Sequence, residues 1–149
     1  MADFSLPEFL PYRLAVAAAR VSRAFSARYR RDFGLTIPEW RVLAHLAQSD
    51  AVSVREIHAR VGMDKSKVSR AAARLQAAGL LAKSANPADA RLVDLRLTPA
   101  GAALFERLIP VALAYQAELV DRLGPAAPGL AAALDRLEAV DAAGEEADE

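Results

Sequence analysis

The chain has 149 residues, of which 54% are hydrophobic and 26% are charged, and its formal net charge is zero. This size fits one globular domain with a real core, and the lack of cysteine excludes disulfides, thiol nucleophiles and cysteine redox switches. With only two histidines, His45 and His58, we also expect no zinc or iron cluster and no cofactor.

The charges are unevenly distributed along the chain. Residues 53–98 hold nine basic and four acidic side chains, a surplus of five, whereas residues 135–149 hold seven carboxylates and one arginine. A basic middle segment is typical of nucleic-acid binders. No stretch approaches the roughly 18 apolar residues of a membrane span, and residues 1–11 lack the regions of a signal peptide. We therefore expect a cytoplasmic protein with no membrane partner.

Two helices are predicted in the first third of the chain. Between residues 6 and 33, apolar residues recur at steps of three and four, which is a helical stripe. The stripe comprises Leu14, Ala18, Val21, Phe25, Tyr29 and Phe33. Gly34 suits the left-handed end of this helix. Thr36 and Pro38 then begin a second helix, with Trp40 on its apolar face.

A short helix, a tight turn and another helix are predicted next. Ser53 is a good N-cap, and Glu56 completes the spacing of a capping box. Gly62 breaks this helix, and Asp64 caps the next one, which runs to Gly79.

From residue 81 the pattern becomes that of strands. Residues 81–83 and 92–97 are predicted to pair as a hairpin, with turn-forming residues at 86–89 between them. A long helix then begins at Thr98 and Pro99, and we expect a kink at Pro110. A last helix is predicted over residues 130–140.

This order of elements predicts a mainly α fold of six helices with a small β-hairpin wing, which is a winged helix-turn-helix. We expect four parts: an N-terminal dimerisation helix at 1–35, a DNA-binding lobe at 36–98, C-terminal dimerisation helices at 99–143 and a disordered acidic tail at 144–149.

The predicted helix from Asp64 to Gly79 has two distinct faces. A helical wheel places an apolar group on the core side, namely Val68, Ala71, Ala72 and Leu75. The opposite face is small, hydroxylic and cationic, which suits insertion into the major groove of DNA. Its candidate base contacts are Ser66, Lys67, Ser69 and Arg70, and its candidate phosphate contacts are Lys65 and Arg74. The alternative is an ordinary solvated helix face.

The hairpin adds a second candidate contact. Arg91 near its tip could enter the narrow minor groove, and Asp89 could hold the guanidinium group by a charge-assisted hydrogen bond. The alternative is a surface salt bridge that only tightens the turn. Ser53 and Lys83 complete the predicted DNA-binding set.

Taken together, these residues resemble the MarR family of bacterial regulators. The resemblance rests on Ser53-Val54-Arg55-Glu56-Ile57, Asp64-Lys65-Ser66-Lys67-Val68-Ser69-Arg70, Leu75, Gly79-Leu80-Leu81, Asp89-x-Arg91 and Leu97-Thr98-x-x-Gly101. It implies a homodimer with interleaved first and last helices, a pseudo-palindromic double-stranded DNA operator, and repression that a small ligand relieves. It also implies that Arg91 is the minor-groove arginine. The wing departs from the family pattern because Ser84 and Ala90 are neutral.

A dimer is also expected on physical grounds, because the apolar stripes of the terminal helices exceed what one small domain can cover. Its two recognition helices would lie about 34 Å apart, one turn of DNA. Trp40 and Arg41 lie where family members form a ligand pocket, and an aromatic wall beside a cation suits an aromatic or phenolic carboxylate. The alternative is that Trp40 belongs to the core and Arg41 is an ordinary surface or interface charge.

Three classes of function differ in the residues that they require. A ligand-responsive DNA-binding repressor is our prediction. The main alternative is a winged helix used for protein interaction or dimerisation without specific DNA readout, which would not need Lys67, Arg70 and Arg91 together. An enzyme is not expected, since we find no phosphate-binding glycine loop, no nucleophile with a base and no convergent pair of carboxylates.

Overall fold

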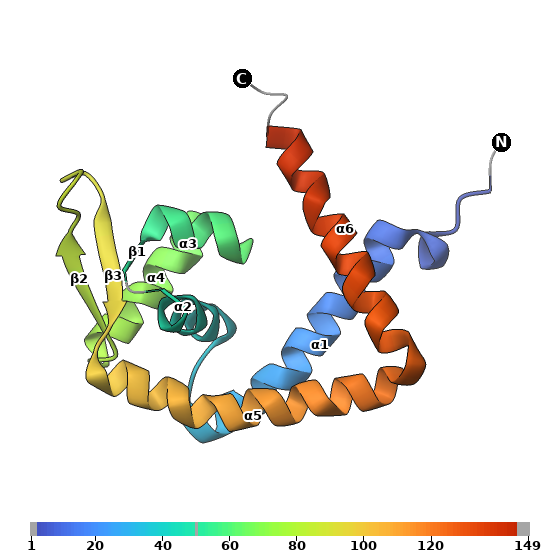
Figure 1. The fold of residues 1–149 in the computed structure, drawn as a ribbon, viewed down its shortest axis with the longest axis horizontal. Helices are drawn as coiled ribbons and strands as arrows, with labels where there is room; N and C mark the ends of the chain where they lie inside the picture. The colour runs from blue at the N-terminus through green and yellow to red at the C-terminus, as the bar shows by residue number, and fades with distance from the viewer. Residues whose placement is uncertain (1–2, 50, 146–149) are drawn as a thin grey trace. The chain divides into compact units, whose positions relative to one another are not determined.

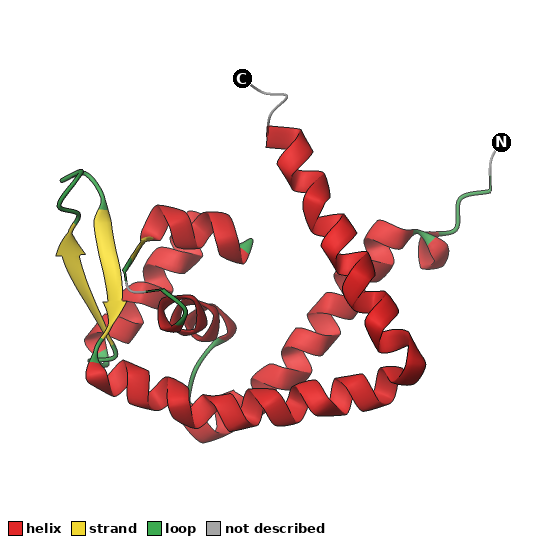
Figure 2. Ribbon diagram, in the orientation of Figure 1, coloured by secondary structure: helices red, strands yellow, loops and turns green. Residues whose placement is uncertain are grey.

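The computed structural model describes residues 3–49 and 51–145, with side chains to residue 140, and the chain forms two compact units, Met1–Val111 and Ala112–Glu149. Figure 1 labels the elements and Figure 2 separates helices from strands. The elements are η1 (Leu6–Glu8), α1 (Leu10–Phe33), α2 (Ile37–Ala47), β1 (Val52–Ser53), α3 (Val54–Val61), α4 (Lys65–Ala77), β2 (Leu81–Ala85), β3 (Val93–Leu97), α5 (Pro99–Leu123), η2 (Gly124–Ala126) and α6 (Ala127–Glu145).

The helix-turn-helix and its wing lie together in the first unit. Helices α3 and α4 are followed by the antiparallel hairpin of β2 and β3, so the predicted fold class is confirmed (Figure 1). The prediction missed β1, which pairs with β3 and makes the sheet order β1-β3-β2. Two residues are too few to show the alternation of a strand. Ser53 both ends β1 and caps α3, so the sequence showed only its second role.

The core of the first unit holds the recognition helix α4 in place. Large side chains from several elements are fully buried, namely Val42 and Leu43 of α2, Ile57 of α3, Leu95 of β3 and Leu108 of α5. The buried face of α4 consists of Val68, Ala71, Ala72 and Leu75, as the helical wheel predicted. Because protein cores are densely packed, the opposite face of α4 is presented on a rigid support.

The wing is joined to α5 by a set of short hydrogen bonds. The Thr98 hydroxyl donates to the carbonyl oxygen of Gly79 at 2.7 Å, and the Thr98 backbone N–H donates to that of Leu80 at 3.1 Å. The same hydroxyl accepts the N–H of Gly101 at 3.1 Å. A Cβ at Gly101 would lie 2.0 Å from the Leu80 carbonyl oxygen, so only glycine allows this close approach. These contacts fix the point where α4 ends and the wing begins.

The second half of the chain differs from the prediction in its boundaries. Helix α5 contains Pro110, where we expected a kink, and α6 begins at Ala127, ahead of the expected residue 130. Pro128 lies in the first turn of α6, where proline costs no hydrogen bond. Helix α6 also covers residues 144–145, which we expected to be disordered. Alanine-rich sequence favours such helical extension. Residues 146–149 of the predicted tail lie outside the described residues, and within the described part no helix is long and apolar enough to span a membrane.

Candidate nucleic-acid interface

Local contacts define both ends of α3 and the start of α4. The Ser53 hydroxyl accepts the N–H of Glu56 at 3.1 Å and caps α3. Gly62 ends that helix in the left-handed conformation, with φ of 63°, and Nδ1–H of His58 donates to the Met63 carbonyl oxygen across the turn. Asp64 then caps α4 by accepting the N–H of Lys67 at 2.9 Å. These caps satisfy backbone groups at both helix ends and so define where α4 begins.

The predicted contact residues lie on the outward face of α4. Lys65, Ser66, Lys67, Ser69 and Arg70 are all exposed. The Ser66 hydroxyl donates to Oδ1 of Asp64 at 2.7 Å, and this bond, followed by the Lys67 backbone N–H, lowers the pKa of the Asp64 carboxyl. Across residues 3–49 and 51–140, no carboxylate lies within salt-bridge distance of Lys65, Lys67 or Arg70. Their positive charges are therefore available to an anionic partner.

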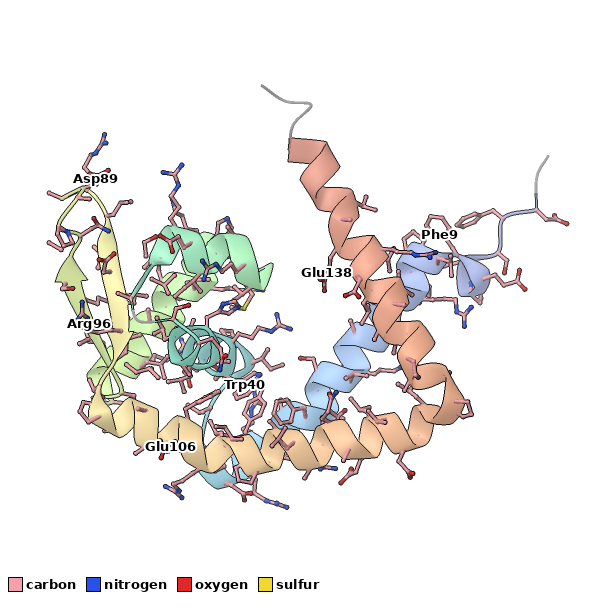
Figure 3. The ribbon with its side chains drawn as sticks, viewed as in Figure 1. Phe9, Trp40, Asp89, Arg96, Glu106 and Glu138 are labelled. Carbon is pink, nitrogen blue, oxygen red and sulfur yellow. The ribbon has the colours of Figure 1, made fainter. Side chains whose placement is uncertain are left out.

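The tip of the wing is ordered by two side chains. The Asn86 side-chain oxygen accepts the backbone N–H groups of Ala88 and Asp89 at 2.8 and 3.0 Å, and its amide nitrogen donates to Oδ1 of Asp94 at 2.9 Å. This is an Asx turn, in which a side chain replaces the backbone acceptor of a turn. It places Asp89 at the end of the hairpin (Figure 3).

Asp89 holds the arginine at this tip. Nε and Nη2 of Arg91 donate to the two Asp89 carboxylate oxygens at 3.1 and 3.2 Å, and the backbone N–H of Arg91 also donates to Oδ1 at 3.0 Å. These bonds lower the pKa of the Asp89 carboxyl, the Arg91 side chain contributing most. The Arg91 side chain is nevertheless 90% exposed. The expected support of Arg91 by Asp89 is thus present in the geometry, and the guanidinium group is presented to solvent.

Three other predicted residues have different surroundings. Ser53 is only 3% exposed and its hydroxyl is engaged as a helix cap, so the structure does not support its predicted contact with DNA. Lys83 is exposed on β2, as a phosphate contact would require. Arg74 is half exposed but donates from Nε to Oε1 of Glu39 at 2.7 Å.

The buried Glu39 is a residue that sequence reasoning missed. Its Oε2 accepts the backbone N–H of Thr36 at 3.1 Å, and the Thr36 hydroxyl accepts the N–H of Glu39, which forms a capping box at the start of α2. The spacing of Thr36 and Glu39 is a signal for this box. Nothing local, however, indicates the pairing of Glu39 with Arg74, which lies 35 residues further along the chain.

Trp40 belongs to an aromatic cluster that joins α1, α2 and α5 within the first unit. Its ring is stacked on Tyr29 at 5.7 Å and on Phe105 at 5.9 Å between ring centroids, and it meets Phe25 edge-on at 5.1 Å. Burial raises the pKa of the Tyr29 hydroxyl, and the positive charge of the half-buried Arg41 opposes that rise. Trp40 is packed against the core, as the alternative interpretation expected, and the charge of Arg41 acts on Tyr29 of the same cluster.

Comparison with known proteins agrees with this geometry. The model of the MarR family matches residues 33–92. An HTH-type transcriptional repressor of Mycobacterium tuberculosis is 32% identical over 124 residues, which are 83% of this chain and 86% of that protein.

Two solved structures extend the likeness to nearly the whole chain. BpsR of Bordetella bronchiseptica, whose DNA binding is regulated by 6-hydroxynicotinic acid, is 30% identical with a TM-score of 0.78, covering 93% of this chain and 98% of BpsR. A MarR family regulator of Silicibacter pomeroyi is 34% identical with a TM-score of 0.76, covering 91% of this chain and 99% of that protein. The chain therefore belongs to the MarR family of transcriptional regulators.

Proposed function

We propose that this protein is a homodimeric repressor that binds a pseudo-palindromic operator and is released from it by a small aromatic acid. The observation that carries the proposal is the pair of cationic elements in the first unit, namely the outward face of α4 and Arg91 at the tip of the wing. The similar protein of M. tuberculosis is itself a transcriptional repressor. A cationic helix followed by a wing is the arrangement that reads the major groove and the adjacent minor groove.

Each residue of the interface has a distinct role in this proposal. Ser66, Lys67, Ser69 and Arg70 read base edges, because residues near the N-terminus of a recognition helix reach deepest into the groove. Lys65, Arg74 and Lys83 bind phosphates, which adds affinity without sequence information. Arg91 enters the minor groove with Asp89 as its support.

The first prediction concerns sequence readout by α4. A duplex is selected with the wild-type protein from a random pool, and alanine is then placed at Arg70 or at Lys67. Each change should cost about 1–3 kcal/mol on the selected duplex and relax specificity at one base position, because a bidentate contact with guanine is lost. Fluorescence anisotropy titrations on the selected duplex and on its single-base variants measure both effects.

Lys65→Ala is the matched control on the same helix. Removing a lysine that binds phosphate should weaken binding to all duplexes equally and lower the salt dependence of binding, without changing base preference. If the wild-type protein bound selected and scrambled duplexes with equal affinity, the prediction of sequence-specific readout would be wrong. The protein-interaction module would then be favoured.

The homodimer is supported by apolar side chains that each unit leaves exposed. In the first unit they lie at the N-terminal end, namely Phe4, Leu6, Phe9, Leu10, Tyr12 and Leu14. In the second unit they lie along α5 and α6, namely Leu113, Val120, Leu123, Leu130, Leu134, Leu137 and Val140. So many exposed large apolar side chains on a single chain favour an interaction site. A second copy of the chain would bury these residues and place two recognition helices about one DNA turn apart.

The small-molecule effector is supported by Trp40 and Arg41 and by the regulation of BpsR by 6-hydroxynicotinic acid. An aromatic acid could stack beside the cluster around Trp40 while its carboxylate pairs with Arg41. With 6-hydroxynicotinic acid as the probe, we expect a rise in melting temperature and release of the bound duplex. Saturation at 100 times the dissociation constant stabilises a protein by about 2.7 kcal/mol. Thermal-shift and anisotropy titrations over a series of aromatic acids measure both effects.

The control for this prediction is a pair of arginine variants. Arg41→Gln should abolish the thermal shift, whereas Arg20→Gln on the exposed part of α1 should leave it unchanged. An equal shift in the two variants would contradict the role of Arg41. No shift with any aromatic acid would contradict this class of effector while leaving the DNA-binding prediction standing.

A further inference from the structure

Glu39 carries a charge in an environment where charges are expensive. Its side chain is 9% exposed, and both carboxylate oxygens have partners, the Thr36 backbone N–H at 3.1 Å and Arg74 Nε at 2.7 Å. A buried carboxylate without partners costs several kcal/mol, so such groups persist where paired donors compensate for the lost hydration. The capping of α2 requires only one of the two oxygens. The second oxygen is directed to the last turn of the recognition helix.

The pairing with Glu39 uses only part of the hydrogen-bonding capacity of Arg74. A guanidinium group has five N–H donors in a fixed planar fork, and Glu39 takes the one on Nε. The Arg74 side chain is 53% exposed, so it is accessible to a partner at the surface. A planar group held by one edge has its orientation fixed, and less conformational entropy is then lost when the outer edge binds a ligand.

The position of Arg74 on α4 indicates what this outer edge binds. Lys67, Arg70 and Arg74 are separated by three and four residues, so their side chains form one stripe along the helix. Lys67 and Arg70 begin this stripe near the N-terminus, where bases are read, and Arg74 ends it in the last turn. A cation at the far end of a recognition helix lies beside the DNA backbone, and the planar fork of arginine suits a phosphate.

We propose that Glu39 is a positioning residue for DNA binding, which orients Arg74 so that its outer donors meet a phosphate of the operator. The proposal rests on the proposed function, since it assigns a role within the same interface. Glu39 does not touch DNA. It acts through Arg74, and the same carboxylate holds the first turn of α2 to the last turn of α4.

The test is a double-mutant cycle on operator binding with Glu39→Gln, Arg74→Met and both changes together. Glutamine keeps the size of the side chain and an oxygen for the Thr36 N–H but removes the charge. Methionine keeps an apolar stem and removes the guanidinium group. Affinity for the duplex selected with wild-type protein is measured at several salt concentrations, and circular dichroism establishes that each variant is folded at the assay temperature.

We expect Glu39→Gln to weaken binding about fivefold in the wild-type background and to have no effect when Arg74 is methionine, because the neutral amide oxygen of glutamine attracts the guanidinium group less strongly than a carboxylate does. Arg74→Met should lower the salt slope by about two, one phosphate contact per subunit. The matched control is Glu56→Gln, a first-turn glutamate of α3 whose pairing with Arg60, at 3.9 Å, does not reach α4. It should change affinity by less than about twofold.

Three outcomes would overturn the proposal. If Glu39→Gln weakened binding equally with and without Arg74, its effect would be a general loss of structure rather than the orientation of Arg74. If Glu39→Gln strengthened binding, the carboxylate would compete with DNA for the arginine. If Arg74→Met left the salt slope unchanged, Arg74 would not meet a phosphate. A wild-type protein that bound no duplex would instead overturn the proposed function as well, and so the two failures are distinguishable.

Discussion

Replacing Arg91 by alanine should weaken binding to the selected duplex about 30-fold or more while the protein stays folded, since a dimer loses two arginine contacts worth about 1–3 kcal/mol each. The side chain is 90% exposed and donates hydrogen bonds to Asp89, so its removal opens no cavity. The minor groove concentrates negative potential, and an arginine that Asp89 already holds loses less entropy on entering it. Anisotropy titration of the variant measures the loss.

Arg96→Ala is the matched control for this prediction. Arg96 is an exposed arginine on β3 of the same hairpin, but it lies away from the tip that carries Asp89 and Arg91 (Figure 3). Its removal should change affinity much less, and both variants should keep the melting temperature and a sedimentation mass of two 15.9 kDa chains. Equal losses in the two variants would mean that the wing contributes only general positive charge. An unchanged affinity in Arg91→Ala with a lowered melting temperature would favour the alternative in which the pair only tightens the turn.

The pairing of Arg91 with Asp89 should persist throughout the physiological pH range. Hydrogen bonds from Arg91 lower the pKa of the Asp89 carboxyl in the folded protein, whereas the unfolded chain has the ordinary value. The stabilising contribution of such a group is complete above its ordinary pKa and is lost as the pH falls through the lowered value. The operator affinity carried by the wing should therefore not depend on pH near neutrality.

The local geometry of the candidate interface could largely be predicted from the sequence because its signals are local. The two faces of α4 follow from helical periodicity alone, and the wheel placed Val68 and Leu75 in the core and Ser69 and Arg70 outside. The caps at Asp64 and Gly62 follow from the conformational preferences of single residues.

What the sequence did not reveal depends on contacts between distant segments. Strand β1 has two residues and exists because β3 offers an edge beside it. The carboxylate of Glu39 meets Arg74 only after α2 and α4 have packed together, and that pairing gives Arg74 a structural partner besides its proposed phosphate. Ser53 was included in the predicted DNA-binding set, but it is 3% exposed, and burial decides whether a hydroxyl can be reached. Periodicity and capping rules do not report the burial of single polar atoms.

The second large effect is expected at Gly101, where an added methyl group has no space. A Cβ there would lie 2.0 Å from the carbonyl oxygen of Leu80 and 3.3 Å from the Leu97 side chain. Because the nearest atom belongs to the backbone, it cannot rotate away, and α5 must separate from the end of α4. Overpacking of this kind costs about 1–3 kcal/mol or more. We expect the cost of Gly101→Ala to lie at the upper end of this range and the melting temperature to fall by about 10 °C.

Gly129→Ala in α6 is the control that separates this steric effect from the general effect of a glycine-to-alanine change in a helix. A Cβ at Gly129 meets nothing within 4 Å, so alanine there should stabilise the helix by about 0.5–1 kcal/mol through its better helix propensity. Both variants are melted by circular dichroism at one protein concentration, since a dimer melts at a concentration-dependent temperature. Changes in melting temperature of opposite sign in the two variants would show that the loss of stability at Gly101 comes from the clash with Leu80. A melting temperature for Gly101→Ala equal to that of the wild type would instead mean that α5 is not held against the wing in the way these contacts require.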